Sequence, residues 1–245
     1  MLQLFIDKGN TALKWQLVEK TSLVGEGVVS NERLLEDEWN TLATQRLSGI
    51  YVSSVGSDNF CRDLTVWAKK YSQPLPVFIE STREVCGVVN AYKEPERLGV
   101  DRWLAMIAAH NKYPGMLCVV DSGTALTMDF LLGNGEHLGG FIVPGAALMT
   151  KSLLDNTQKI QLDDTAKQGQ LGKNTKEAVS FGIEQMLQAF VRGKVVEIES
   201  KYQQKVTVVL TGGHANDLLD GLVVSVELEG DLVLQGLKLI VKQSQ

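Results

Sequence analysis

The sequence predicts an α/β protein built from two related halves. Short apolar runs typical of strands alternate with amphipathic segments typical of helices, which is the pattern of α/β proteins. A turn sequence that begins Asp-x-Gly occurs twice, as Asp7–Thr11 and Asp121–Ala125, and each copy lies between two apolar runs. A repeat in equivalent strand contexts indicates internal duplication. We therefore expect two halves, residues 1–115 and 116–245, that face each other across a cleft.

The elements of the first half follow from apolar runs and from apolar residues at helical spacing. Each predicted strand is a short apolar run bounded by turn residues. The predicted helices carry apolar residues at i, i+3, i+4 and i+7, as Val100, Trp103 and Ile107 do in the last of them. The predicted strands are residues 2–6, 13–18, 49–55 and 77–79, and the predicted helices are residues 31–46, 57–71 and one that begins near Val100.

The second half contains three predicted strands, a capped helix and two glycine-rich turns. Asn174–Glu177 has the Asn-x-x-Glu form of a capping box, so we expect a helix to begin there. Residues 139–145 and 211–215 are predicted to be turns, each either structural or placed against a ligand. The apolar density of residues 231–242 predicts a packed helix, which contacts either its own chain or a partner subunit. The predicted strands are residues 116–120, 126–130 and 206–210.

Charge and cysteine content restrict the class of protein. The sequence has 24 basic and 29 acidic side chains, a formal net charge of -5, which disfavours nucleic acid as a partner. Cys61, Cys86 and Cys118 have neither CxxC spacing nor a neighbouring histidine, so we expect no disulfide framework and no zinc site. Met1 is not followed by a basic leader region, and no apolar stretch is long enough to cross a bilayer. We expect a cytoplasmic protein that does not bind a membrane.

The repeated turn has the chemistry of a phosphate-binding loop. Glycine allows a backbone in which successive amide N–H groups point at one anion, and Asn10, Thr11 and Thr124 add short hydrogen-bond donors. A strand-end aspartate would repel a phosphate, so Asp7 and Asp121 are better explained as ligands of Mg²⁺ or another cation, directly or through water. A single copy is also ordinary hairpin chemistry, because Asp and Gly are common in turns. Two equivalent copies favour a pair of hairpins that hold one nucleotide.

Asp101 and Arg102 form a third candidate motif. Asp101 lies in the first turn of the helix that begins near Val100, and Arg102 follows it. One interpretation is that an acidic residue in a first turn only complements the helix dipole. The other is functional: the guanidinium of Arg102 holds an anion while the Asp101 carboxylate engages a hydroxyl group. The residues alone leave both interpretations open.

In order along the chain, these motifs resemble those of the type III pantothenate kinases, and the resemblance runs nearly end to end. Asp7–Thr11 is similar to the family's first phosphate motif, and Asp121–Ala125 to its second. Gly99–Arg102 is similar to the substrate motif, and Thr211–Ala215 to the turn on the nucleoside side. The resemblance implies two ribonuclease-H-like domains of the actin, hexokinase and acetate kinase superfamily, with the active site in the cleft between them. It also implies ATP-dependent phosphorylation of the primary hydroxyl of pantothenate to 4′-phosphopantothenate, the first step of coenzyme A biosynthesis.

The resemblance implies a role for each matching residue. Asp101 would be the general base, Asp7 would bind Mg²⁺ directly or through water, and Asp121 would bind a monovalent cation, K⁺ or NH₄⁺. The implied ATP contacts are Asp7, Lys8, Gly9, Asn10, Thr11, Ala12, Leu13, Lys14 and Thr124. The implied pantothenate contacts are Tyr92, Gly99, Val100, Asp101, Arg102 and Thr175. A homodimer is implied as well.

Lys8 departs from the family pattern, because its position is often apolar in the family. Its charge either contacts a phosphate or belongs to an exposed turn lysine, and we expect the second because lysines are mostly exposed. His214 fills the variable position of the nucleoside turn and is assigned no catalytic role. His110 and His137 are interpreted as structural or superficial.

Three other functions are compatible with parts of the sequence. Relatives described as accessory factors of transcriptional regulation suggest a regulatory protein with little or no kinase activity, but every motif residue is retained. A ribonuclease-H-like nuclease would place acidic residues at strand ends to hold two metal ions, yet the acidic balance and the turn sequences favour a phosphate chain. Another small-molecule kinase of the superfamily would share both hairpins and differ around Tyr92, Asp101 and Thr175.

Overall fold

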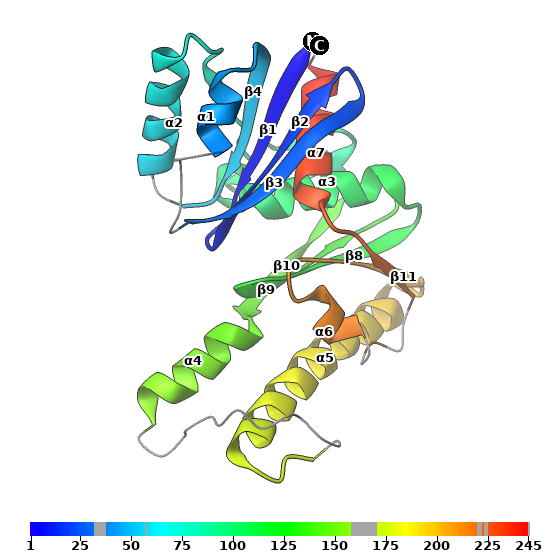
Figure 1. Ribbon diagram of the computed structural model, residues 1–245. Helices are drawn as coiled ribbons and strands as arrows, with labels where there is room; N and C mark the ends of the chain where they lie inside the picture. The colour runs from blue at the N-terminus through cyan, green and yellow to red at the C-terminus, as the bar shows by residue number, and fades with distance from the viewer. Residues whose placement is uncertain (32–37, 57, 158–170, 220–221, 223–224, 245) are drawn as a thin grey trace. The chain divides into compact units, whose positions relative to one another are not determined.

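Two compact units make up the chain in the computed structural model (Figure 1). The first unit consists of Met1–Lys112 together with Asp231–Gln245, and the second of Tyr113–Gly230. The boundary lies slightly before the predicted one, and residues 231–245, which we assigned to the second half, belong to the first unit. The structure describes residues 1–31, 38–56, 58–157, 171–219, 222 and 225–244.

The first unit is built on a five-stranded sheet. Its strands are Leu2–Lys8 (β1), Ala12–Glu19 (β2), Ser22–Ser30 (β3), Leu47–Ser54 (β4) and Pro76–Phe78 (β5), in the order β3-β2-β1-β4-β5. β1 pairs antiparallel with β2 and parallel with β4, while β2 pairs antiparallel with β3 and β4 pairs parallel with β5. The first Asp-x-Gly turn is therefore the β1–β2 hairpin, as predicted.

The second unit repeats this sheet strand for strand. Its strands are Met116–Ser122 (β8), Ala125–Leu131 (β9), His137–Pro144 (β10), Val206–Thr211 (β11) and Val226–Leu228 (β12), in the order β10-β9-β8-β11-β12. β8 pairs antiparallel with β9 and parallel with β11, β9 pairs antiparallel with β10, and β11 pairs parallel with β12. The duplication predicted from two short turns thus extends to the whole topology of both sheets.

Helices cover both faces of the first sheet. On one face Glu38–Ala43 (α1) and Asp58–Lys70 (α2) place Trp39, Leu42, Phe60 and Leu64 against β1, β2 and β4. The predicted helix 31–46 is described only from residue 38, since residues 32–37 lie outside the described residues. On the other face lie Val100–Lys112 (α3) and Leu232–Gln243 (α7), while β6 (Glu84–Val85), β7 (Val88–Val89) and a 3₁₀ turn (Pro95–Arg97) connect β5 to α3.

α7 explains why the C-terminal residues belong to the first unit. Leu234, Leu237 and Val241 are buried and pack in one cluster with Phe5 of β1 and Leu104 of α3. The sequence pattern predicts this apolar face but does not identify the surface that it covers. Here the surface is the chain's own sheet and α3.

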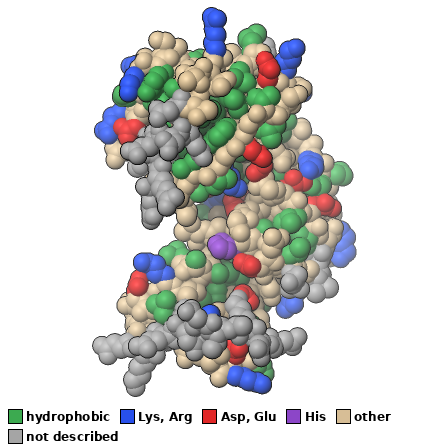
Figure 2. Space-filling view, in the orientation of Figure 1, with side chains coloured by type: hydrophobic (Ala, Val, Ile, Leu, Met, Phe, Trp, Pro, Cys, Tyr) green, Lys and Arg blue, Asp and Glu red, His purple; other side chains and the backbone are tan. Residues whose placement is uncertain are grey.

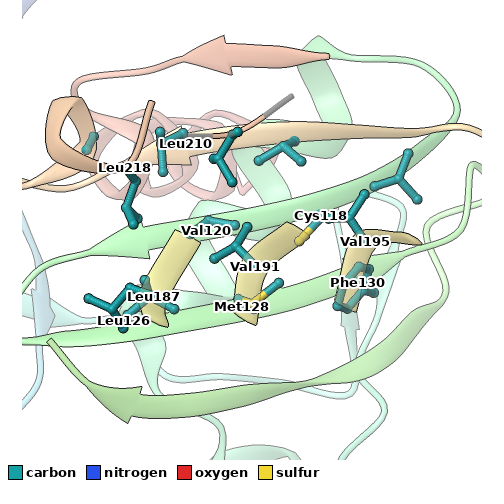
Figure 3. Close-up of a cluster of buried hydrophobic side chains, with 14 of the residues drawn as sticks. Cys118, Val120, Leu126, Met128, Phe130, Leu187, Val191, Val195, Leu210 and Leu218 are labelled. Carbon is teal, nitrogen blue, oxygen red and sulfur yellow. The ribbon is translucent and has the colours of Figure 1, made fainter. Parts of the chain in front are cut away.

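The core of the second unit lies between its sheet and the long helix α5 (Thr175–Tyr202), with the shorter helices α4 (Ala146–Asn156) and α6 (Ala215–Leu219) beside it. The strand residues that point into it alternate along the chain, as expected for strands buried on one face. Figure 3 shows side chains of β8 (Cys118, Val120) and β9 (Leu126, Met128, Phe130) packed against side chains of α5 (Leu187, Val191, Val195).

The predicted glycine-rich turn at residues 139–145 is wrong, because most of this segment is strand β10. Gly139 and Gly140 pair with Phe130 and Asp129 of β9. The register shifts between His137 and Gly139, whose φ of 107° is open to glycine. The glycines therefore absorb a β-bulge within a strand instead of forming a turn.

The described surface carries charges of both signs. On the face shown in Figure 2, acidic and basic side chains are interspersed over both units, without a dominant basic stripe in the described part. None of the helices in the described ranges combines the length and apolarity that crossing a membrane requires.

Candidate functional site

The first hairpin is closed by its own backbone. The amide of Gly9 donates a hydrogen bond of 3.0 Å to the carbonyl oxygen of Ala12. Asp7 on β1 stands directly opposite Lys14 on β2, so their side chains project from the same face of the sheet. The turn thus places a carboxylate and an ammonium group beside a glycine backbone, which is the donor and charge set that a metal-bound phosphate chain requires.

Asn31, which the sequence analysis missed, braces this hairpin from the end of β3. Its side-chain amide donates to the carbonyl oxygens of Gly9 at 3.0 Å and Asn10 at 2.7 Å. Its backbone amide donates to the carbonyl oxygen of Thr11 at 3.1 Å. Three successive turn carbonyls are therefore held by one residue that lies 20 or more positions along the chain. Only the register of β3 against β2 could have identified it.

Replacing Asn31 with Ala should loosen the turn and raise the KM for ATP. Two hydrogen bonds, each worth about 0.5–1.5 kcal/mol, correspond to an increase of about 5- to 150-fold. Initial rates measured over a range of ATP concentrations at saturating acceptor test this. Asn134→Ala is the matched control, because Asn134 accepts a backbone hydrogen bond in the β9–β10 turn instead. An unchanged KM in Asn31→Ala would remove Asn31 from the phosphate turn.

Lys8 is buried, so the expectation of an exposed turn lysine is wrong. Only 9% of the residue is exposed, and its Nζ donates to the carbonyl oxygen of Gly9 at 3.0 Å and lies 5.9 Å from the centre of the Phe60 ring. Strand alternation explains this, because Lys8 shares its face with Leu4 and Ile6, under α2. Burial lowers the pKa of Lys8, and the neighbouring Asp7 carboxylate partly opposes that shift.

Asp101 is held at the N-terminus of α3. Its Oδ1 accepts a hydrogen bond of 2.8 Å from the backbone amide of Arg102. Gly99 leaves room for this carboxylate, because a Cβ at position 99 would lie 2.6 Å from the same oxygen. The dipole interpretation and the functional one are compatible here. The helix N-terminus stabilises the negative charge of Asp101, and the Arg102 amide together with Gly99 restricts the position of its carboxylate.

Gly99→Ala should therefore displace the Asp101 carboxylate without unfolding the chain. A misplacement on the order of 1 Å costs about 100-fold in turnover, so we expect kcat to fall by about that factor. The Tm should change little, because only the end of one side chain must move. Gly182→Ala, in α5, is the control: apart from the helix's own nearby backbone, no atom of the described residues lies within 4 Å of its added Cβ. Wild-type kcat in Gly99→Ala would show that the position of this carboxylate is unimportant.

Arg102 joins the start of α3 to the loop that precedes it. Its Nη1 donates to the hydroxyl of Tyr92 at 3.1 Å, and its guanidinium carbon lies 5.8 Å from the centre of the Tyr92 ring. Arg102 is 7% exposed. The structure therefore links three of the predicted substrate residues: the Arg102 guanidinium contacts Tyr92, and the Arg102 backbone amide holds the Asp101 carboxylate.

A second residue missed in the sequence, Asn90, fixes the loop that carries Tyr92. It is 2% exposed, and its side-chain amide donates to the carbonyl oxygens of Thr82 and Pro95, both at 3.2 Å. Its Oδ1 accepts from the backbone amide of Tyr92 at 3.0 Å. Arg83 completes the arrangement by donating to the carbonyl oxygen of Asn90 at 2.9 Å. A loop without long strands or helices thereby gains a defined conformation.

Asp7 and the first turn of α3 lie on the same face of the first sheet. Phe5, two residues before Asp7, packs in one cluster with Val100 and Leu104 of α3. Side chains two residues apart along a strand point to the same face, so Asp7 projects toward the side on which Asp101 begins its helix. Within the first unit, the strand that carries Asp7 and the helix that carries Asp101 therefore meet on one face of the sheet.

The second hairpin is braced by two other segments of its unit. Gly123 donates to the carbonyl oxygen of Ala125 at 3.0 Å, as Gly9 does in the first hairpin. The backbone amide of Gly145, before α4, donates to the carbonyl oxygen of Thr124 at 2.9 Å. The backbone amide of His214 donates to the carbonyl oxygen of Ser122, also at 2.9 Å. Three separate backbone hydrogen bonds thus hold the turn that contains Thr124.

Gly212 lies directly against Asp121. Its φ is 99°, and a Cβ at this position would overlap Asp121 Oδ1 and the carbonyl oxygen of Ser122. Strand register pairs Asp121 with Thr211, so the loop at Thr211–Ala215 begins beside this carboxylate. The predicted nucleoside turn and the predicted cation ligand are therefore in contact.

Thr175 is the first residue of α5 in the second unit. Asn174 caps this helix, because its side chain accepts from the amide of Glu177 at 2.8 Å, as the capping box predicts. The Glu177 carboxylate accepts instead from the amide of Lys173, also at 2.8 Å. The structure thus places Thr175, Asp121 and Thr124 in one unit, and Tyr92, Asp101 and the first hairpin in the other.

The histidines have structural surroundings or lie at the surface. His137 Nε2 is 3.0 Å from Asp129 Oδ1, and both side chains are buried. His214 is half-exposed and lies 3.3 Å from Asp217. His110 borders Gly87, where a Cβ would be 3.6 Å from its Nε2.

The surroundings of Asp7 are compatible with Mg²⁺, and Asp121 stays the predicted ligand of a monovalent cation. The described ranges contain no group of three or more His, Cys, Asp and Glu side chains arranged for a metal. Mg²⁺ in kinase sites is held by one or two carboxylates together with water and the substrate phosphates, so Asp7 at a phosphate hairpin is a sufficient protein ligand. At Asp121, the space beside the carboxylate is one that a side chain at position 212 would fill.

Comparisons with known proteins agree with these motifs. The sequence profile of the family described as Type III pantothenate kinase matches residues 3–197. A type III pantothenate kinase of Pseudomonas putida (strain W619) is 38% identical over 217 residues, which are 86% of this chain and 87% of that protein.

Solved structures show the same fold. A Campylobacter jejuni protein assigned to the Baf family of transcriptional activators has 20% sequence identity and a TM-score of 0.62, over 98% of both chains. A ROK family protein from Streptococcus pneumoniae TIGR4, in complex with sucrose, has 13% identity and a TM-score of 0.52, over 100% of both chains. These likenesses establish the fold, and with the repeated sheets they confirm the predicted fold class.

Proposed function

The chain belongs to the type III pantothenate kinase family, and we propose that it transfers a phosphoryl group from ATP to the primary hydroxyl of pantothenate. The product is 4′-phosphopantothenate, the first intermediate on the route to coenzyme A. The observation that carries this proposal is the pairing of a phosphate hairpin with Asp101 on one face of the first sheet. Phosphoryl transfer requires little more than alignment and charge neutralisation, which such a pairing provides.

The first hairpin binds the phosphates of ATP in this proposal. Residues 7–14 supply backbone amides, the Asp7 carboxylate and the Lys14 ammonium group, while Asn31 and Lys8 hold the turn carbonyls in place. Asp7 would hold Mg²⁺, which would supply positive charge to offset that of the phosphates. Thr124, in the second hairpin, provides a further contact to ATP.

Asp101 accepts the proton of the pantothenate hydroxyl as it attacks the γ-phosphorus. A carboxylate of ordinary basicity serves, because the hydroxyl loses its proton late in a loose transition state. The positively charged Arg102 pairs with the negatively charged pantothenate carboxylate. Tyr92, Gly99 and Val100 line the position of the acceptor. Thr175 contributes a further substrate contact from α5.

The remaining features of the proposal come from the family. Asp121 binds a monovalent cation, K⁺ or NH₄⁺, next to Gly212. The active species is a homodimer in the cytoplasm. The assignments of Asp7 and Asp101 do not depend on the monovalent cation, the homodimer or the cytoplasmic location. Any of these three properties can be wrong without affecting them.

A substrate panel tests the proposal. Purified protein is supplied with ATP and Mg²⁺, with and without K⁺, and with pantothenate or other small alcohols, and ADP release is followed. ADP release with pantothenate alone, stimulated by K⁺, is the expected result. Release with another alcohol would move the chain to a different kinase of the superfamily, and the absence of turnover with bound ATP would favour a regulatory protein.

A further inference from the structure

Ser53 has a buried hydroxyl group without a hydrogen-bond partner. The residue is 0% exposed, and among the described residues its Oγ has neither a donor nor an acceptor at hydrogen-bond distance. Burying an unsatisfied hydroxyl costs about 1–3 kcal/mol, and most buried polar groups are paired. Alanine at this position would avoid that cost. The presence of serine therefore indicates that the hydroxyl gains a hydrogen-bond partner when substrate binds.

The position of Ser53 identifies that partner. Ser53 on β4 stands directly beside Asp7 on β1 in the parallel register. In the row before it, Tyr51 and Phe5 stack with ring centres 5.4 Å apart, so both strands turn these alternate side chains to the same face. Ser53 and Asp7 form the next row, on the side where the first turn of α3 packs.

The second unit contains the same pair. Asp121 on β8 stands beside Thr211 on β11 in the equivalent parallel register, and Thr211 is 4% exposed. Each motif aspartate therefore has a buried hydroxyl residue beside it on the neighbouring parallel strand. The duplication thus includes an Asp–hydroxyl pair in addition to the hairpin.

We propose that Ser53 is a positioning residue for Asp7: its hydroxyl oxygen accepts a hydrogen bond from a water molecule of the Mg²⁺ shell that the Asp7 carboxylate would hold. This inference rests on the proposed function, because it requires that Asp7 binds Mg²⁺ with ATP. Mg²⁺ keeps several of its waters in such sites, and those waters need acceptors and donors from the protein. Loss of a supporting group of this kind costs about 10- to 100-fold in metal affinity or activity.

Calorimetric titration with ADP, with and without Mg²⁺, provides a readout that is independent of catalysis. In wild type we expect Mg²⁺ to strengthen ADP binding. In Ser53→Ala this strengthening should shrink by about 10-fold or more, while binding of ADP without metal stays the same. Ser54→Ala is the matched control, because Ser54 is the next residue and points to the opposite face, that of Lys8.

Stability and a conservative variant separate positioning from a structural role. Ser53→Ala removes no hydrogen bond, so its Tm should equal or exceed that of wild type. Ser53→Thr should keep most of the strengthening of ADP binding by Mg²⁺, since threonine occupies the equivalent position in the second unit. A lower Tm in Ser53→Ala with unchanged Mg²⁺ dependence would overturn the proposal.

The same titration distinguishes this proposal from the proposed function. If wild type shows a Mg²⁺ effect on ADP binding that depends on Ser53 but does not phosphorylate pantothenate, the acceptor assignment fails and the role of Ser53 stands. If Mg²⁺ does not strengthen ADP binding in wild type, the role of Ser53 fails, whichever acceptor is used.

Discussion

Asp101→Asn is expected to lower kcat for pantothenate phosphorylation by about 10²- to 10⁴-fold, the usual contribution of a general base. The asparagine side chain has the same shape and its oxygen still accepts from the Arg102 amide, so the start of α3 should keep its geometry. The KM for ATP should change little, because the ATP contacts lie in other segments. Steady-state kinetics with both substrates varied will check this.

The control for this variant is Asp63→Asn, which removes an exposed carboxylate from α2. It should retain wild-type kinetics. Near-normal turnover in Asp101→Asn would exclude Asp101 as the base and leave it the role of stabilising the helix N-terminus. Loss of ATP binding in the same variant would indicate that the change had disturbed more than proton transfer.

Gly236→Ala is expected to destabilise the first unit. The added Cβ would overlap the backbone carbonyl of Leu104, because α7 crosses α3 at this glycine. Overpacking of this kind costs about 1–3 kcal/mol or more, and a backbone obstacle cannot rotate away. Over a chain of this size, the Tm should fall by about 2–12 °C. Thermal unfolding followed by circular dichroism measures the shift.

Gly193→Ala supplies the opposite expectation for the same substitution. Gly193 lies within α5, and in the described part of the chain nothing beyond that helix's own nearby backbone lies within 4 Å of its added Cβ. Alanine in a helix interior is favoured over glycine by about 0.5–1 kcal/mol, so the Tm should stay the same or rise. Equal Tm values for Gly236→Ala and wild type would show that α7 does not pack this closely against α3.

The sequence predicts best what depends on neighbouring residues. Both hairpins, the strands that flank them and the capped start of α5 follow from local apolar runs, turn residues and the Asn174 cap. The predicted substrate residues Tyr92, Asp101 and Arg102 are also brought together in the structure. Local patterns are therefore sufficient to predict these elements, while the roles of Tyr92, Asp101 and Arg102 stay predictions.

Residues that act across strands could not be predicted in this way. Asn31, Asn90, Gly145 and Ser53 acquire their contacts from strand register or from loops closed over long separations. β3 was missed because Gly25 and Gly27 interrupt its pattern. The glycine at position 27 is required by packing, since a Cβ there would lie 2.6 Å from the indole nitrogen of Trp15.

The surroundings of Lys8 and of α7 could not be predicted from the sequence either. For each, composition predicted an ordinary outcome, an exposed lysine and a helix in the second half. Strand alternation turns Lys8 under α2, and an apolar face brings α7 back to the first sheet. Both outcomes depend on tertiary packing, which determines which face of an element is covered.

The product formed from ATP and pantothenate is the most direct test of the proposed reaction. Mass spectrometry and phosphorus NMR should show one 4′-phosphopantothenate for each ADP, with the phosphate ester on the primary hydroxyl. Asp101→Asn should abolish most of this product while still binding ATP. ATP bound and pantothenate recovered unchanged, under conditions that supply Mg²⁺ and K⁺, would contradict the assignment of both acceptor and base.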